Sequence, residues 1–265
     1  MKPYFNYILY ILVFFMNSLY SQACLVGDCL EGYGEYVYQD GAQYVGNFND
    51  GIKNGKGEFI FSDERKYKGE FLNDKINGEG IMYFTDGSTY KGDFINGLGH
   101  GNGLFIFIDG TTYEGAFELG KENGQGKLVL SNGSYFSGLF VNGSLNGLGQ
   151  WLGSNGDKYS GEFENGVFQG QGNYSYSNGS NYIGTFTNGK KNGFGAFTIN
   201  ISNYTESYSG EFKNDVFEGF GTYYFSNGSV YNGEFKNGLF HGDGKYTLDD
   251  GSQFAGYFQF GDFVK

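Results

Sequence analysis

The chain has 265 residues, of which 49 are glycine and 20% are aromatic, while proline occurs once, at Pro3. Glycine that does not recur at every third position, without abundant proline, excludes collagen, and this many aromatic residues exclude a disordered low-complexity chain. The formal net charge of −12 disfavours nucleic acid and anionic lipid headgroups as partners, because phosphates would be repelled.

Residues 1–23 have the pattern of a signal peptide. Lys2 precedes a largely apolar run at residues 4–16, and Ser21 and Ala23 occupy the −3 and −1 positions of a cleavage site before Cys24. The apolar run is short for a membrane span. We expect an exported protein (secreted, periplasmic or at the cell surface), with a retained anchor as the alternative.

Cys24 and Cys29 are the only cysteines and follow directly after the predicted cleavage site. In an exported protein, two nearby cysteines predict a local disulfide. Lipidation of Cys24 is the alternative, although the residues before Cys24 fit a lipidation signal poorly. A zinc site is disfavoured because His100 and His241, the two histidines, lie far away in the sequence.

A repeat of 23 residues dominates the rest of the chain. An aromatic residue, a glycine two places later and a phenylalanine two places after that recur ten times. Eight of the nine intervals are 23 residues long, and the interval from Tyr182 to Tyr208 is 26. Such periods predict an array in which each unit packs only against its neighbours. Counting each first aromatic residue as position 0, the units start at Tyr44, Tyr67, Tyr90, Tyr113, Phe136, Tyr159, Tyr182, Tyr208, Tyr231 and Phe254.

Each unit is predicted to form one β-hairpin. Apolar residues or glycine alternate with polar residues at positions 0 to +4, and apolar residues alternate again at +15 and +17, which is the period of a strand. We expect glycine-rich loops, such as residues 49–54 and 96–100, to join the two strands. Asp-Gly or Asn-Gly pairs at +19 and +20 predict positive-φ turns at the end of most units. No segment of the array is predicted to be helical.

The aromatic residues are predicted to form the core by stacking over glycine. Glycine weakens a strand unless a neighbouring ring covers its backbone. Binding of sugars or bases by these rings is the weaker interpretation. Representative core positions are Tyr67, Gly69, Phe71, Tyr90, Gly92, Phe94, Tyr159, Gly161 and Phe163.

The Tyr-x-Gly-x-Phe motif, with a later Asn-Gly-x-Gly at residues 77–80 and 192–195, closely resembles MORN repeats (membrane occupation and recognition nexus) over residues 31–265. The resemblance implies an all-β fold: an elongated single-layer antiparallel sheet of about ten stacked 23-residue hairpins. Residues 1–23 would be the signal peptide, 24–43 a cysteine-containing cap and half-repeat, and 44–265 the repeat array. Members of the family serve as scaffolds and interaction modules, and some are proposed to contact phosphoinositide membranes. Others carry a kinase or methyltransferase domain, for which we expect no room here.

Two features depart from the family pattern. The acidity of the chain puts lipid contact in doubt. Three additional residues after Gly195, within the stretch 200–203, replace the usual turn and predict a protruding loop.

No motif of catalysis or cofactor binding stands out, so we expect no enzyme activity, no cofactor and no metal site. His100 and His241, both at +10, are interpreted as loop residues, and Trp151 at +15 as a core residue. Acids at +3 predict a solvated polar row, with calcium binding as the weaker reading. These acids are Glu70, Asp93, Glu162, Glu211 and Glu234.

Position +16 should face away from the aromatic core, yet it is apolar in the first five units and mainly polar afterwards. The residues of this apolar stripe are Ile60, Tyr83, Ile106, Val129 and Leu152. An apolar row on an open sheet face predicts a contact surface, with packing beneath the N-terminal segment or simple β-propensity as the alternative.

We therefore expect a non-enzymatic exported scaffold that binds an unknown protein partner or forms a homo-oligomer, through its faces and its exposed edge strands. The alternative is a surface ligand-binding module, with an extracellular glycan as the first choice and anionic membrane lipid as the second.

Overall fold

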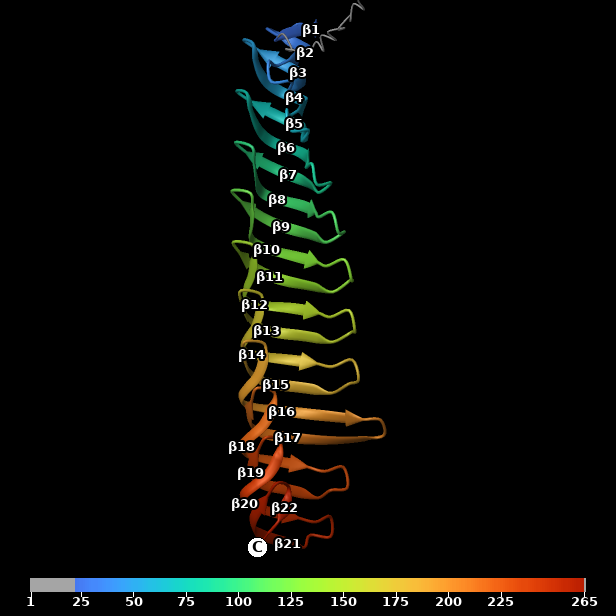
Figure 1. Ribbon diagram of the computed structural model, residues 1–265, viewed down its shortest axis with the longest axis vertical. Helices are drawn as coiled ribbons and strands as arrows, with labels where there is room; N and C mark the ends of the chain where they lie inside the picture. Colours follow the sequence, from blue (N-terminus) through green and yellow to red (C-terminus); the bar gives the residue numbers. More distant parts are fainter. Residues whose placement is uncertain (1–21, 265) are drawn as a thin grey trace, which may run out of the picture.

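A computed structural model describes residues 22–264, so most of the predicted signal peptide, residues 1–21, lies outside the described part. These residues form one open 22-stranded sheet in which every strand pairs antiparallel with the next strand in the sequence (Figure 1). The predicted elongated, all-β hairpin array is confirmed. Between residues 22 and 264, no helix is long and apolar enough to span a membrane.

The strands are β1 Ala23–Gly27, β2 Gly32–Val37, β3 Gln43–Asn49, β4 Ile52–Ile60, β5 Lys66–Leu72, β6 Lys75–Tyr83, β7 Thr89–Ile95, β8 Leu98–Ile106, β9 Thr112–Glu118, β10 Lys121–Val129, β11 Tyr135–Val141, β12 Ser144–Leu152, β13 Lys158–Glu164, β14 Val167–Ser175, β15 Asn181–Thr187, β16 Lys190–Ile201, β17 Tyr204–Lys213, β18 Val216–Tyr224, β19 Val230–Lys236, β20 Leu239–Thr247, β21 Gln253–Gln259 and β22 Asp262–Phe263.

The two strands of a unit are joined by a turn of only two residues, at +6 and +7. Both residues have positive φ, as at Asn96 (50°) and Gly97 (84°). Such a pair forms a type I′ turn, whose twist matches that of paired strands. The predicted glycine-rich loops at residues 49–54 and 96–100 are therefore wrong, because all but the two turn residues belong to strands. His100 and His241 likewise lie in β8 and β20 rather than in loops.

Consecutive units are joined by a longer turn that uses the Asp-Gly and Asn-Gly pairs. The Gly87 N–H donates to Phe84 O (3.1 Å), and the Phe84 N–H donates to Ser88 O (3.0 Å). Gly87 has a positive φ of 89°. The side chain of Asp86 accepts a hydrogen bond from the Ser88 N–H at 2.9 Å. Only the glycine of the pair needs positive φ, and the Asp or Asn closes the turn through its side chain.

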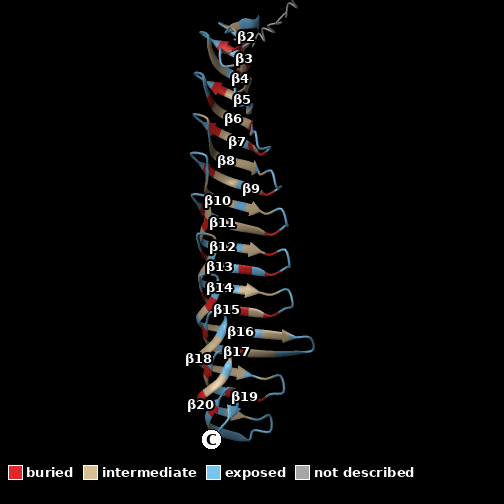
Figure 2. Cartoon of the chain, viewed as in Figure 1, coloured by how far each residue is buried: buried red, intermediate tan, exposed pale blue. Residues whose placement is uncertain are grey.

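The core rests on a continuous row of glycines, which we call the glycine seam. Glycines at +2 and +13 pair across successive strands without interruption, from Gly34 in β2 to Gly256 in β21. The tyrosine at position 0 lies over both glycines of its unit, and a Cβ on either glycine would overlap the ring. The eight tyrosines at position 0 are at most 3% exposed. Figure 2 shows the buried residues recurring at the same place in successive units.

The tyrosine rings also connect neighbouring units. The Tyr67 ring makes edge contacts with Phe71 of its own unit (5.2 Å between centroids) and Phe94 of the next (5.1 Å). Trp151, interpreted as a core residue, is half-buried and packs against Phe168 (5.6 Å). The fifth unit differs, because Phe136 at position 0 is only half-buried. Its place over the seam is taken by Leu145, which is fully buried and approaches Gly138.

The three additional residues after Gly195 lengthen a hairpin instead of forming a loop. β16 and β17 pair continuously from Gly193 opposite Phe212 to Ile201 opposite Tyr204, with Ser202 at positive φ in the turn. Asn200 ties this extension to the preceding turn by donating to Gly179 O (2.7 Å). The prediction of a loop is therefore wrong. The segment does protrude, but as a paired hairpin that extends beyond its neighbours (Figure 1).

Candidate interaction surface

The face opposite the tyrosine rings leaves the glycine seam uncovered, and a hollow of about 920 Å³ lies over it between β4 and β9. One wall carries Lys68 and Lys91, with Ile81 and Leu104 between and beside them, and ends at Glu114, which pairs with Leu104. The other wall carries the carboxylates of Glu70, Glu79 and Asp93, with Lys56 opposite Glu70. Both walls therefore carry both signs of charge, on either side of a floor of glycine backbone.

The apolar stripe runs along one border of this face. Its members Ile60, Tyr83, Ile106, Val129 and Leu152 come from the ends of β4, β6, β8, β10 and β12. Tyr83 and Ile106 are 43% and 40% exposed, and the other three are half-buried. Tyr135 pairs with both Val129 and Leu152 and so extends the apolar row between them.

The acidic row at +3 has local backbone partners that the sequence did not indicate. The second strand of each of the first nine units contains a bulge near position +11, where glycine has positive φ, as at Gly170 (60°). The Glu162 carboxylate lies against Gly170 and accepts a hydrogen bond from the Gln171 N–H at 2.9 Å. Glu211 accepts similarly from the Phe220 N–H (3.3 Å). Within residues 22–264, no three His, Cys, Asp or Glu side chains gather in a group that could hold a metal ion.

Two lysines at +9, Lys53 largely buried and Lys191 buried, form a feature that sequence analysis missed. Lys53 Nζ donates to the Tyr38 hydroxyl (3.1 Å) and lies 3.1 Å from Asp74 Oδ1. It also lies 5.4 Å from the centre of the Phe59 ring, within cation–π range. These aromatic rings and the carboxylate together compensate the burial of the ammonium group.

Lys191 repeats this arrangement six units further on. Its Nζ donates to the Tyr176 hydroxyl (2.8 Å) and lies 4.6 Å from the Phe197 ring centre, while Asp215 accepts from its backbone N–H (3.0 Å). The signal was present in the sequence. Tyrosine occurs at +17 only before these two lysines, and aspartate replaces the turn glycine at +7 only after them.

Asp157, just before the sixth unit, is a buried carboxylate with a complete set of partners. Burial opposes its ionisation, but hydrogen bonds from the Ser177 N–H (2.8 Å) and the Tyr174 hydroxyl (2.8 Å) outweigh that effect. They hold the pKa of Asp157 below its usual value. Glu206 occupies the same position in a later unit and accepts from the Tyr223 hydroxyl. Both carboxylates join neighbouring units and are not free to act on a ligand.

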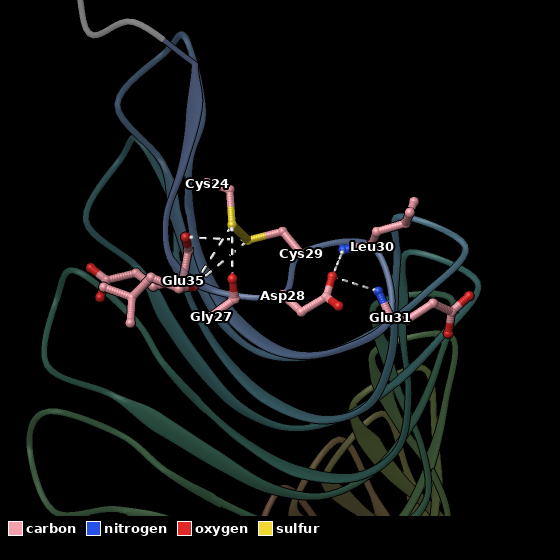
Figure 3. The surroundings of a disulfide bond; sticks show 8 residues. Cys24, Gly27, Asp28, Cys29, Leu30, Glu31 and Glu35 are labelled. Atoms are coloured by element: carbon pink, nitrogen blue, oxygen red, sulfur yellow. Dashed lines mark hydrogen bonds between the residues drawn. A yellow bond between two sulfur atoms is a disulfide. The ribbon is translucent and has the colours of Figure 1, made fainter.

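Cys24 and Cys29 form a disulfide, with their Cα atoms 6.0 Å apart, at the edge of the sheet where β1 pairs with β2 (Figure 3). Between them, Asp28 accepts hydrogen bonds from the N–H groups of Leu30 (2.9 Å) and Glu31 (3.0 Å). The bonds from Glu31 and Leu30 lower the pKa of Asp28. Cys29 Sγ lies against Gly34, the first glycine of the seam.

Of the two histidines, His100 lies close to Asp93 because Asp93 pairs with it in β7 and β8. Its Nδ1 is buried and has no hydrogen-bond partner within the described chain. His241 pairs with Glu234 in the equivalent place of a later unit. The two histidines lie in β8 and β20, at the same position of units that are six repeats apart, so the structure brings neither near the other or near the cysteines in β1 and the following turn.

The family comparison agrees with this architecture. Ten MORN repeats match, at residues 30–43, 44–64, 67–89, 90–112, 113–135, 136–158, 159–181, 182–200, 208–230 and 231–253. The chain belongs to the MORN-repeat family and is a repeat scaffold. No curated protein matches the chain as a sequence relative.

Solved structures show only weak similarity. The SAS-4 (dCPAP) TCP domain of Drosophila melanogaster, in complex with a proline-rich motif of Ana2 (dSTIL), is 13% identical, with a TM-score of 0.40 over 70% of this chain and 99% of that one. The TCP10 domain of Danio rerio CPAP, in complex with a STIL peptide, is 12% identical, with a TM-score of 0.34 over 89% and 98%. An inactive virginiamycin B lyase from Staphylococcus aureus, with quinupristin, is 13% identical, with a TM-score of 0.15 over 90% and 73%. Scores this low support no inference about function.

Proposed function

We propose that the protein is an exported, non-enzymatic scaffold that binds a protein partner or a second copy of itself through the open face of β4–β12. The observation that carries this proposal is the apolar stripe beside the charged hollow. Tyr83 and Ile106 remain at least 40% exposed although they lie in a paired sheet. Apolar rows of this kind on an open face mark contact surfaces.

The charges of the hollow support a protein as the partner. Its lining combines three lysines with four carboxylates, so both signs of charge are offered within one site. A protein surface can match such a mixed pattern, whereas a polyphosphate or an anionic membrane would meet carboxylates on both walls. The disulfide at the first edge supports an oxidising destination, and so export.

The test replaces two residues of the stripe together, Ile106→Asp and Leu152→Asp. We expect the loss of self-association in sedimentation velocity, or of the partner set found by proximity labelling in the source organism, because each aspartate would have to be desolvated in the interface. Thr198→Asp is the matched control, since it places the same charge at +16 of a later, polar unit. Unchanged self-association and unchanged partners in the double variant would show that the stripe is not a contact surface.

A further inference from the structure

A second hollow, of about 500 Å³, lies over the glycine seam between β14 and β19, on the same face as the first but in the other half of the array. Its floor includes Gly195, Gly210 and Gly221. In contrast to the first hollow, its lining contains no charged residue and combines apolar side chains with neutral polar ones. The two hollows therefore suit ligands of different chemistry.

Two phenylalanines, Phe194 in β16 and Phe220 in β18, stand at this hollow and are 70% and 61% exposed. Both occupy position +12, where the other units carry polar residues or leucine. Neither ring contacts another aromatic ring within residues 22–264, so they add nothing to the stacked core. With β17 between them, their strands are roughly 10 Å apart, twice the usual strand spacing.

The remaining side chains of the lining supply neutral hydrogen-bonding groups. Asn232 donates to the Thr222 hydroxyl at 2.6 Å, which fixes the amide and leaves its carbonyl oxygen as an acceptor. Ser209 from β17 adds a hydroxyl, and Gln171 from β14 adds a second amide that donates to Thr185 at 2.9 Å. Glu211 of β17 lies between the two rings, opposite Phe194, and its carboxylate accepts from the Phe220 N–H at 3.3 Å. Beside it the floor is glycine, so a ligand can approach the backbone closely.

We infer that this hollow binds a neutral, extended β-linked glycan. The C–H faces of two sugar rings would pack on Phe194 and Phe220, whose separation is comparable with the length of a disaccharide, and the sugar hydroxyls would bond to Asn232, Thr222 and Ser209. Exposed rings and fixed amides match an uncharged polyhydroxyl ligand, whereas an anionic ligand would find no positive charge in the lining and would meet the Glu211 carboxylate. This activity goes beyond the proposed scaffold function and uses a different half of the face.

The inference is tested by isothermal titration of the full chain with two soluble probes, a hexamer of β-1,4-linked glucose and a hexamer of β-1,4-linked N-acetylglucosamine. We expect one of the two to bind and thereby to identify the sugar. Phe194→Ala and Phe220→Ala should each weaken binding about tenfold, which corresponds to about 1.4 kcal/mol. Both rings are exposed, so the urea midpoint of each variant should match that of the natural protein.

Leu148→Ala is the matched control, because Leu148 is an equally exposed (77%) residue at +12 that lies outside the hollow. It should bind the hexamer with unchanged affinity. Failure of both hexamers to bind would overturn the inference, as would equal losses in the Leu148 control. Loss of self-association, instead of sugar binding, in the phenylalanine variants would also overturn it and would make the hollow a protein contact. Because the stripe is not altered in these variants, each of these results is independent of the test of the scaffold function.

Discussion

The hydroxyl group of the tyrosine at position 0 explains why tyrosine, and not simply any aromatic residue, occupies this place. In all eight units that begin with tyrosine, the hydroxyl donates to the carbonyl of residue +3, as from Tyr67 to Glu70 (3.0 Å). The ring can therefore be buried with its polar atom satisfied. The two units that begin with phenylalanine lack this bond, and their rings, Phe136 and Phe254, are not buried.

At the residue scale, Gly80→Ala should destabilise the protein by about 1–3 kcal/mol, because the new methyl group would overlap the Tyr67 ring. Urea unfolding followed by circular dichroism measures the loss. In a Tyr67→Leu background the same substitution should be less harmful, since the ring that it meets is gone. Equal losses in both backgrounds would show that the ring does not impose the need for glycine.

At the element scale, the two-residue turns differ in how well their residues suit positive φ. Five of the ten turns carry Asn-Gly, but the turn between β9 and β10 places Leu119 at a φ of 50°. A leucine in the left-handed region is strained, whereas asparagine tolerates that region. The side chain of Leu119 is also largely exposed, so no packing compensates for the strain.

Leu119→Asn should therefore stabilise the protein by about 0.5–1 kcal/mol, measured as a shift in the urea midpoint. The reverse change in the equivalent turn, Asn96→Leu, should destabilise it by a similar amount. An unchanged or lowered midpoint for Leu119→Asn would indicate that the leucine makes a favourable contact that outweighs its backbone strain.

The elements themselves were largely predictable, because the period of two and the glycine positions define paired strands without knowledge of the neighbours. The turns were not, because Asn-Gly occurs at both ends of a unit: Asn96-Gly97 makes a two-residue turn, whereas Asn132-Gly133 makes a longer one. The sequence after +6 also contains further glycines. They suggest a loop, but in the structure they form a β-bulge within the second strand. Which side chain lies over the seam could not be predicted from the local sequence, because it depends on packing between strands. Leu145, for example, takes this place instead of Phe136.

At the scale of the whole molecule, the buried tyrosines couple stability to alkaline pH. Burial raises the pKa of Tyr67, Tyr90, Tyr113, Tyr159, Tyr182 and Tyr231 to about 12. In the unfolded chain they would ionise near pH 10. Their contribution to stability is therefore complete below about pH 10 and is lost as the pH rises toward about 12.

We expect the urea midpoint to fall steeply from pH 10 upward, together with the appearance of tyrosinate absorbance at unfolding. Tyr67→Phe keeps a ring but removes one ionisable hydroxyl, so its stability should fall slightly less steeply with pH, although it is lower at neutral pH because the bond to Glu70 is lost. A urea midpoint that does not change between pH 9 and 11 would contradict the proposal that burial of the tyrosine hydroxyls opposes their ionisation.

The whole face could be predicted only in part. Alternation along the strands predicts which positions point away from the core, and this was enough to find the stripe of Ile60 to Leu152. The hollow with Phe194 and Phe220 was not found, although pairing is regular from +11 onward and places +12 on the same face as +14 and +16. Its signal, a phenylalanine at +12 in two consecutive units, concerns two strands that are not paired with each other. Differences between the two halves of the face appear only when neighbouring units are placed side by side.

The order of the strands has a consequence for how this protein folds during its synthesis. Since each strand pairs with the one synthesised just before it, and the N–H at +7 of each unit donates to the +9 carbonyl of the previous one, no unit waits for a distant part of the chain. A chain emerging from the ribosome or from a translocation pore can add hairpins vectorially, each templated by the last. Growth of the array and growth of the polypeptide then proceed in the same direction.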